Sequence, residues 1–192
     1  MAIKKIVVLF SGTGSNMQNI VQKLHKKIFS GYTVEVSAVI TNNKNAAGIQ
    51  KAAEIGVHCE ILPHTDFESR ESFDAALVDL IRGFSPDLTV LAGFMRILTP
   101  VFTDSIAAIN IHPSLLPLFK GKDGIKESFE SGMKVGGVSV HRVSEGMDDG
   151  EIIAQRCLPI LKTDTFESYK KRVHAVEHEI YPEAVLEALG LS

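Results

Sequence analysis

Tryptophan is absent from this 192-residue sequence, and cysteine occurs only at Cys59 and Cys157. Two cysteines outside a C-x-x-C pair exclude a disulfide framework, so we expect both to be small buried apolar side chains in a reducing compartment. No stretch approaches the roughly 18 apolar residues that cross a bilayer. The run from Ile6 to Phe10 is too short for a signal peptide and precedes no cleavage site. These absences predict a soluble, cytoplasmic protein with no membrane partner.

Neither sign of charge dominates, because 20 Lys and Arg stand against 23 Asp and Glu for a net charge of −3. Without a basic field, no nucleic-acid partner is predicted. A composition of 45% hydrophobic and 22% charged residues excludes a disordered chain. At about 150 residues per domain, the length predicts a single domain over residues 1–192.

Strand and helix patterns alternate along the chain. Strands are predicted at Ile3–Phe10, Thr33–Ile40, Val57–Leu62, Asp87–Ala92, Ala108–Ile111, Val138–Val143 and Glu151–Ile160. Helices are predicted from Met17 to about Lys27, at Ala46–Ile55, from Asp66 or Ser69 to Gly83, at Thr99–Ala107 and at Asp123–Ser131. A last helix, Phe166–Leu189, should be bent or divided by Pro182. The alternation predicts an α/β fold with one open, mostly parallel twisted sheet, helices on both faces (Rossmann-like) and an antiparallel edge toward the C-terminus.

Three polar clusters follow predicted strands, at the carboxyl edge where an open parallel sheet binds ligands. The first is the turn Ser11–Asn16, whose glycines let a backbone approach a ligand and whose helix start attracts an anion. Met17 stands where G-x-G-x-x-G needs glycine, and no Gly-Lys-Ser/Thr follows, so this is neither a dinucleotide fingerprint nor a Walker loop. The turn is either a site for one small phosphate or a tight turn capped by Ser15 or Asn16.

The second cluster is Gly93–Leu98, with the sequence GFMRIL, and it places apolar side chains just past a strand end. Soluble proteins seldom leave such side chains exposed without a partner. They either sandwich a flat aromatic ligand or pack beneath the following helix, and the residues alone leave both open.

The third cluster contains Asn110 and His112, which lie two apart on a strand and therefore point to the same side. An amide donor beside an imidazole can stabilise a developing oxyanion and move a proton. A carboxylate to set the charge on His112 is available in the loop at 144–150, where spacing does not rank Glu145, Asp148 and Asp149.

Metal and covalent chemistry are not predicted. His112 has no His, Cys or acidic companion at ligand spacing, and no G-x-S-x-G elbow is present. His174 and His178 are four apart but lack the H-E-x-x-H motif, so they are expected to be a solvated or locally paired helix face.

Four motifs in this order resemble the folate-dependent formyltransferases. They are GTGSN at 12–16, AGFMRIL at 92–98, NIHPSLLP at 110–117 and MDDG at 147–150. The glycine turn and the segment EHEIYP at 177–182 resemble the branch of the family that acts on glycinamide ribonucleotide.

The resemblance implies a role for each motif. Gly14, Ser15 and Asn16 would bind the phosphate of the ribonucleotide in the N-terminal half, and Glu177 would help to place the glycinamide. The catalytic and folate sites would lie in the C-terminal half. The catalytic trio would be Asn110, His112 and Asp148, and the folate-binding residues would be Arg70, Met95, Arg96, Ile97, Leu98 and Asn110.

The resemblance implies an enzyme of purine (IMP) biosynthesis that transfers the formyl group of 10-formyltetrahydrofolate directly to the glycinamide amine. It would be a monomer or a homodimer. Asn110 and protonated His112 would donate to the oxyanion of a tetrahedral intermediate, and Asp148 would favour the imidazolium by charge pairing. A water held by His112 and Asp148 would relay the proton. Asp149 adds a like charge and is expected to raise the pKa of Asp148.

Three other functions share some of these features. A formyltetrahydrofolate hydrolase has a similar catalytic half, and Phe119-Lys120-Gly121 resembles that branch, but its extra N-terminal domain has no counterpart before Ile3. A nucleotide- or folate-binding module would need neither His112 nor a loop carboxylate. Formylation of methionyl-tRNA would need an RNA-binding extension that this sequence lacks.

Overall fold

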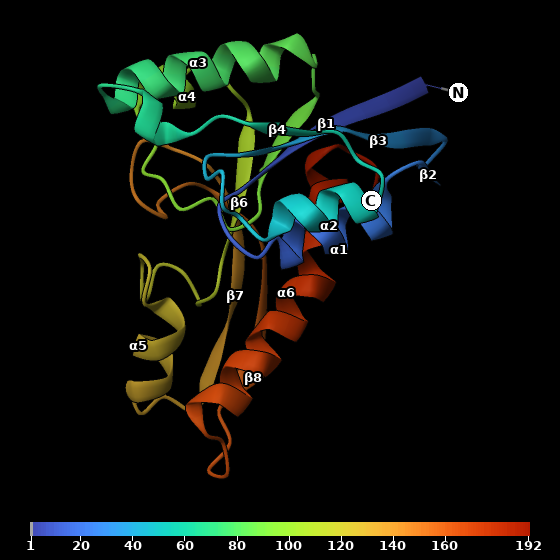
Figure 1. Cartoon of the computed structure of the whole chain (residues 1–192). Coiled ribbons are helices and arrows are strands. Elements are labelled where there is room, and N and C mark those ends of the chain that lie inside the picture. The colour runs from blue at the N-terminus through green and yellow to red at the C-terminus, as the bar shows by residue number, and fades with distance from the viewer. Residues whose placement is uncertain (1) are drawn as a thin grey trace.

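The computed structural model describes residues 2–192, whose strands form one twisted sheet in the order β2–β3–β1–β5–β6–β7–β8, with β4 also paired to β3 (Figure 1). The strands are β1 (Ala2–Phe10), β2 (Lys27–Phe29), β3 (Tyr32–Thr41), β4 (Cys59–Ile61), β5 (Leu88–Leu91), β6 (Ala108–His112), β7 (Val135–Arg142) and β8 (Ile152–Pro159). The helices are α1 (Ser15–Leu24), α2 (Gly48–Glu54), α3 (Arg70–Gly83), α4 (Pro100–Thr103), α5 (Gly124–Glu130) and α6 (Phe166–Ala188), with a 3₁₀ turn η1 at His64–Asp66.

The pairing confirms the predicted fold class. Strands β4, β3, β1, β5 and β6 run parallel to one another, whereas β7 and β8 continue the sheet as an antiparallel edge. Parallel strands end at the same edge of a sheet, so the segments after β1, β5 and β6 meet there.

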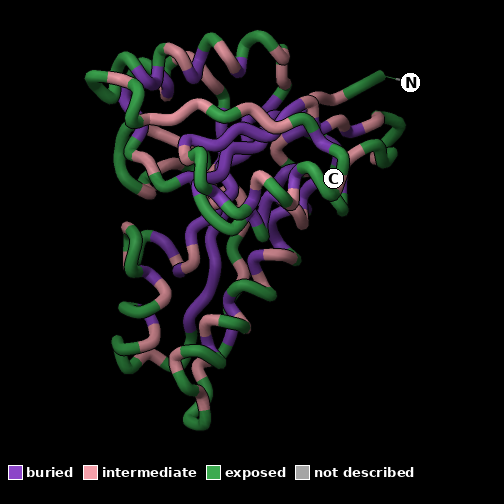
Figure 2. Tube along the Cα trace, in the orientation of Figure 1, coloured by how far each residue is buried: buried purple, intermediate pink, exposed green. Residues whose placement is uncertain are grey.

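Helices cover both faces of the sheet, as predicted. Alternate side chains of β1 enter two separate cores: Ile6 and Val8 face α1, α2 and α6, while Val7 and Leu9 face α3 and α4. Figure 2 shows the buried trace along these central strands, with exposed residues on the outer sides of the helices. Each such apolar side chain contributes about 1.5–3 kcal/mol when fully buried, so burial on both faces stabilises the central strands that precede the polar clusters.

Two predicted helix ends differ from the structure. The first helix ends at Leu24 instead of about Lys27, because Lys26 adopts a positive φ of 58° and its N–H donates to the Val34 carbonyl, which starts the hairpin of β2 and β3. The helix predicted at Thr99–Ala107 is only the four residues of α4. After α4 the Ser105 and Ile106 N–H groups both donate to the Phe102 carbonyl, and the Ala107 carbonyl accepts from the Thr89 N–H, 3.0 Å away, so the chain has joined the sheet by Ala107.

The start of α3 is set by Ser69, one of the two predicted caps. Its hydroxyl accepts from the Ser72 N–H at 3.0 Å, and the Ser72 hydroxyl lies 3.2 Å from the Ser69 N–H in a reciprocal capping box. The prediction that both cysteines are buried is wrong, because Cys59 is only half-buried and Cys157 is exposed. Cys157 lies opposite Gly137 on β8, which is the last strand of the sheet, so one side of this residue has no neighbouring strand among the described residues.

Pro182 does not divide the last helix, because α6 continues through it. Proline lacks the N–H that would bond to the carbonyl four residues earlier, which here belongs to His178. Two side chains of α1 replace that donor: Asn19 Nδ2 lies 2.8 Å and Lys23 Nζ 2.9 Å from the His178 carbonyl oxygen. The His178 carbonyl, which lacks its usual helical donor, thus links α6 to α1 through these two hydrogen bonds. No helix within residues 2–192 has the length and apolar character needed to span a membrane.

Candidate active site

Hydrogen bonds join the segments that follow β1 and β5. The Ser11 N–H donates to the Gly93 carbonyl at 3.0 Å, and the Met95 N–H donates to Ser11 Oγ at 2.7 Å. Ser11 Oγ in turn donates to Asn42 Oδ1 at 2.6 Å, beyond β3. The first two predicted clusters therefore form one continuous surface at the carboxyl edge.

The turn at the start of α1 leaves helix N–H groups without a side-chain cap. The N-cap is Gly14 in a left-handed conformation, φ 68°, so the alternative of a cap from Ser15 or Asn16 is wrong. A Cβ at Gly14 would lie 2.9 Å from the Gly48 Cα, so this position requires glycine on both counts. Asn16 Oδ1 is buried with no hydrogen-bond partner among the described residues. Uncapped amides beside an unsatisfied amide side chain are typical of a site whose ligand completes the hydrogen bonding.

Side chains of the second cluster divide between the two predicted roles. Phe94 and Leu98 are buried in the core beneath α3 and α4, whereas Met95 is 74% and Ile97 53% exposed. Arg96 lies with its guanidinium 5.3 Å from the ring centroid of Phe73, and its Nε is buried without a partner in the described chain. Arg70 is exposed at the first position of α3. The cluster thus has an anchored side and an apolar side open to a ligand.

The structure brings Asn110, His112 and Asp148 together. Asn110 and His112 lie on β6, and Asp148 Oδ2 reaches from the 144–150 loop to 3.3 Å from His112 Nδ1. The His112 side chain is 5% and the Asp148 side chain 12% exposed. A buried carboxylate next to an imidazole favours the protonated ring, and the protonated ring together with the neighbouring amide can stabilise an oxyanion.

His141 also belongs to this group, although no motif in the sequence indicated it. Its Nε2 lies 3.3 Å from Asn110 Nδ2 and 3.5 Å from Asp148 Oδ1. It pairs directly with Asn110 in the antiparallel register of β6 and β7. The signal available in the sequence was this strand pairing, which places His141 next to Asn110 although the two are 31 residues apart.

The pKa of Asp148 is lowered from 3.8 to about 2. Burial alone would raise this pKa, but a hydrogen bond from His141, the Gly121 N–H and the positive charges of His112 and His141 together outweigh it. The expectation that Asp149 raises this pKa is wrong. Asp149 is exposed and forms an ion pair with Lys120, which lowers its own pKa.

The segment at 119–124 lies against the group of Asn110, His112 and Asp148. The Phe119 carbonyl lies 2.7 Å from His112 Nε2, and the Gly121 N–H donates to Asp148 Oδ2 at 2.8 Å. A carbonyl only accepts, so His112 Nε2 carries a proton in this arrangement. In this structure His112 Nε2 is therefore occupied by the chain's own backbone.

Glu177 is buried on α6, with a side chain only 6% exposed, and its Oε2 lies 2.6 Å from His174 Nδ1. This contact confirms the expected local pairing of His174. One turn later, the buried Tyr181 hydroxyl donates to the Leu91 carbonyl at 2.7 Å and so fixes α6 against the end of β5. Burial, with the nearby Glu177 charge, raises the pKa of Tyr181 well above its usual value.

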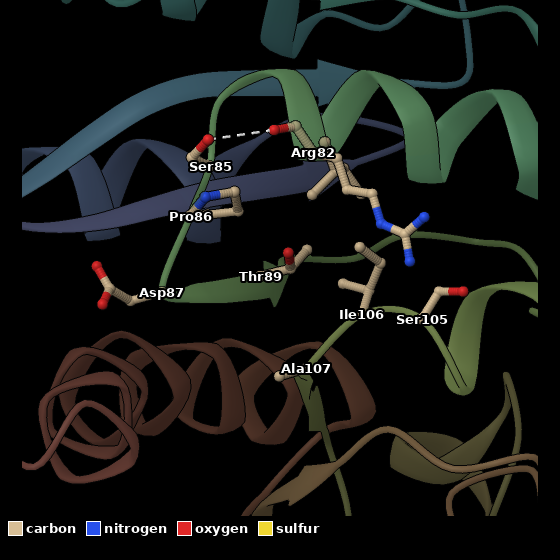
Figure 3. Close-up of a pocket in the computed structure, with 9 residues that line it drawn as sticks. Arg82, Ser85, Pro86, Asp87, Thr89, Ser105, Ile106 and Ala107 are labelled. Carbon is tan, nitrogen blue, oxygen red and sulfur yellow. Dashed lines mark hydrogen bonds between the residues drawn. The ribbon is translucent and has the colours of Figure 1, made fainter.

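A cavity of about 310 Å³ lies elsewhere, at the amino ends of β5 and β6 (Figure 3). Arg82, Ser85, Thr89 and Ile106 line it, and none of them was singled out in the sequence. In residues 2–192 no three His, Cys, Asp or Glu side chains are grouped as a metal ion requires.

Comparison with known proteins identifies the family. The model of the family described as formyl transferase matches residues 4–185, which is nearly the whole chain. The chain belongs to the formyl transferase family. Its Asn110, His112 and Asp148 cluster lies inside the matched range.

Three similar proteins show how far the likeness extends. The crystal structure of phosphoribosylglycinamide formyltransferase from Campylobacter jejuni is 52% identical, with a TM-score of 0.95, and the match covers 98% of this chain and 100% of that one. The Bacillus subtilis phosphoribosylglycinamide formyltransferase is 34% identical over 99% of this chain and 97% of its own length. The trifunctional purine biosynthetic protein adenosine-3 of Drosophila melanogaster is 40% identical over 95% of this chain, which spans only 14% of that much longer protein.

Proposed function

We propose that this member of the formyl transferase family transfers the formyl group of 10-formyltetrahydrofolate to the amine of N1-(5-phosphoribosyl)glycinamide, in purine (IMP) biosynthesis. The observation that carries the proposal is the match over nearly full length to phosphoribosylglycinamide formyltransferases, with Asn110, His112 and Asp148 gathered at one edge of the sheet. The trifunctional relatives are much longer than this chain, and only the activity of the part that matches the chain is proposed for it.

The start of α1 supports a phosphate site. The N–H groups of Ser15 and Asn16 belong to the first turn, where the helix dipole favours an anion and no side chain of the N-cap competes. Gly12 has open space around its Cα, since a Cβ there would meet no atom within 4 Å. A phosphate at this turn would also give the buried Asn16 side chain a partner through its bound water or ribose.

The 93–98 cluster supports the folate site. The exposed side chains of Met95 and Ile97 fit the faces of a flat pterin ring, and the unsatisfied Arg96 Nε fits a polar group of the ligand. Arg70 at the entrance supplies a cation for the carboxylates at the far end of a folate. When bound, 10-formyltetrahydrofolate supplies the formyl group, and Asn110 lies on the neighbouring strand.

The chemistry required of the chain is to stabilise a negative oxygen and to move a proton. Asn110 donates an amide N–H to that oxygen, and His112 donates from Nε2 as an imidazolium. Asp148, ionised because its pKa is about 2, favours the charged ring through Nδ1. For this the Phe119 carbonyl must first leave His112 Nε2, so the 119–124 segment moves aside when substrate binds.

The test is the consumption of 10-formyltetrahydrofolate by the purified protein with and without glycinamide ribonucleotide. We expect consumption only with the amine present, and a loss of about a hundredfold or more in kcat for His112→Ala. Equal consumption without the amine would instead indicate a hydrolase, with water as the acceptor. The cytoplasmic location and the monomer or homodimer state stay predictions.

A further inference from the structure

The cavity of about 310 Å³ in Figure 3 lies at the opposite edge of the sheet from the candidate active site. It opens between the end of α3, the start of β5 and the segment that leads into β6. Its volume corresponds to about ten water molecules at ~30 Å³ each, near the lower end of the range for sites that bind small molecules. Among the described residues that line it, none belongs to the proposed catalytic, phosphate or folate sites.

Thr89 supplies a buried polar group to this cavity. The residue is 1% exposed, and its hydroxyl has no hydrogen-bond partner in the part of the chain that the structure describes. Its N–H donates to the Ala107 carbonyl at 3.0 Å, so the pairing of β5 with β6 fixes the position of this residue. Figure 3 shows the hydroxyl directed into the space between Pro86 and Ile106. Buried hydroxyl groups in folded proteins nearly always have a partner, and an oxygen of a ligand in the cavity would provide one.

Arg82 supplies a positive charge to the same cavity. It lies in the last turn of α3, and Figure 3 shows its side chain extending toward Ser105 and Ile106. Within residues 2–192 its guanidinium forms no ion pair. Asp87 is the one carboxylate among the lining residues, and it is engaged elsewhere: its Oδ1 lies 3.0 Å from Lys4 Nζ and its Oδ2 2.8 Å from the Lys5 nitrogen. The cavity therefore has one positive charge that the described residues do not balance.

We propose that this cavity binds a small monocarboxylate that carries a second oxygen, such as a short hydroxy acid. The carboxylate binds Arg82 and the Ser105 hydroxyl, and the second oxygen bonds to the Thr89 hydroxyl. The site is separate from the proposed formyl transfer and does not depend on it.

Three features of the cavity favour a carboxylate over a phosphate. The planar guanidinium matches the two oxygens of a carboxylate, and one cation balances one negative charge. The C-terminal carbonyls of α3 form the negative end of the helix dipole beside the cavity, which opposes a second negative charge on the ligand. Ile81, Pro86 and Ile106 add apolar surface that fits a short carbon chain.

The first experiment is an NMR titration of the unaltered, ¹⁵N-labelled protein at constant ionic strength. We expect 2-hydroxybutanoate to cause saturable amide shifts confined to residues 81–89 and 105–108, with a Kd below about 10 mM. Butanoate, which lacks the hydroxyl, should bind at least about threefold more weakly, and the uncharged 2-hydroxybutanamide at least about tenfold more weakly. Shifts spread over the whole surface, or no saturation by any of the three probes up to about 50 mM, would overturn the proposal.

The second experiment repeats the titrations with single variants. Arg82→Gln should raise the Kd of 2-hydroxybutanoate at least about tenfold, whereas the exposed Lys27→Gln on β2 is the matched control and should leave it unchanged. Thr89→Val keeps the shape of the side chain, so it should weaken 2-hydroxybutanoate to the affinity of butanoate and change butanoate by less than about twofold. An unchanged Kd in Arg82→Gln, or equal weakening of both acids in Thr89→Val, would overturn the proposal.

The stability of Thr89→Val gives a readout that needs no ligand. If the Thr89 hydroxyl is buried without a partner in the free protein, its removal relieves an unfavourable desolvation. The midpoint of urea unfolding should therefore stay equal or rise in this variant. A clearly lower midpoint would show that the hydroxyl bonds within the chain and is not available to a ligand, which would overturn its assigned role.

Discussion

Two adjacent aspartates, Asp148 and Asp149, have opposite environments although the sequence places them side by side. Asp148 turns inward with a backbone φ of 49°, a left-handed conformation that aspartate and asparagine tolerate better than most residues. Asp149 points outward to Lys120. A spacing argument treats the two as equivalent carboxylates, and only the backbone conformation of the loop separates them.

Asparagine substitutions should therefore separate these neighbours. Asp148→Asn keeps the shape and the left-handed backbone but removes the charge beside His112, so we expect kcat to fall by about a hundredfold or more. Asp149→Asn removes a screened surface charge, and its effect should stay within about threefold. Because the pKa of Asp148 is about 2, the profile of kcat/KM between about pH 5 and pH 9 should not move in Asp149→Asn. A large loss from Asp149→Asn alone would reassign the catalytic carboxylate.

The lowered pKa of Asp148 also predicts how stability depends on pH. A carboxyl whose pKa is lower in the folded protein than in the unfolded chain stabilises the fold above its ordinary pKa of 3.8, and this contribution is lost as the pH falls toward about 2. The shift corresponds to about 1–2 kcal/mol once partial solvent exposure is allowed for. Urea unfolding of the unaltered protein and of Asp148→Asn should show their difference in unfolding free energy shrinking by this amount between about pH 4 and pH 2. A difference that stays constant would contradict the assignment.

At the scale of elements, α1 depends on glycine at its N-cap. Gly14→Ala places a Cβ on a left-handed residue and against the backbone of α2, so we expect a loss of about 1–3 kcal/mol in the free energy of unfolding. Gly12→Ala meets no atom within 4 Å and should change stability by less than about 0.5 kcal/mol. Chemical denaturation of both variants checks this pair. Equal stability of the two variants would mean that α1 and α2 move apart at little cost to accommodate the added methyl group.

The contact between α1 and α6 compensates for Pro182. Asn19→Ala should lower the free energy of unfolding by about 0.5–1 kcal/mol, because Lys23 still donates to the His178 carbonyl. In a Pro182→Ala background the restored N–H occupies that carbonyl, and Asn19→Ala should then cost less. Thermal unfolding of the four proteins measures the coupling, with the exposed Asn45→Ala as control. Additive losses would show that Asn19 acts independently of the proline.

Elements with a strong local signal were predictable from the sequence, and elements set by distant partners were not. The apolar run of β1 and the serine cap of α3 are local features, and both were correct. The chain that follows the short α4 bonds to Thr89 of another strand, and the His178 carbonyl that Pro182 leaves without its helical donor bonds to side chains of α1. The same division holds in the candidate site: Asn110 and His112 share a strand, so their proximity was predictable, whereas His141 becomes their neighbour only through the pairing of β6 with β7.

Across the whole molecule, the order of strands sets the spacing of the proposed subsites. The phosphate turn follows β1, the reaction centre follows β6, and β5 alone separates these strands. At about 4.8 Å per strand, the two strand axes lie about 10 Å apart. A phosphoribosyl group has the extent to bridge such a gap, so the phosphate would act as a remote anchor for the amine. The strand order of the parallel sheet thus fixes the distance between the two proposed subsites. The single-domain organisation stays a prediction.

This geometry predicts that removing the phosphate lowers the rate of a reaction that takes place two strands away. The dephosphorylated riboside should react with a kcat/KM at least about a hundredfold below that of the ribonucleotide, because binding energy at the remote anchor also orients the amine. Gly12→Ala should reduce kcat/KM for the ribonucleotide while leaving the riboside and the KM for 10-formyltetrahydrofolate unchanged, since its added methyl group affects only the phosphate turn. Steady-state assays of both substrates with both proteins give the four values needed. Equal rates for ribonucleotide and riboside in the unaltered protein would show that the turn at α1 is structural and that the amine is positioned by other groups.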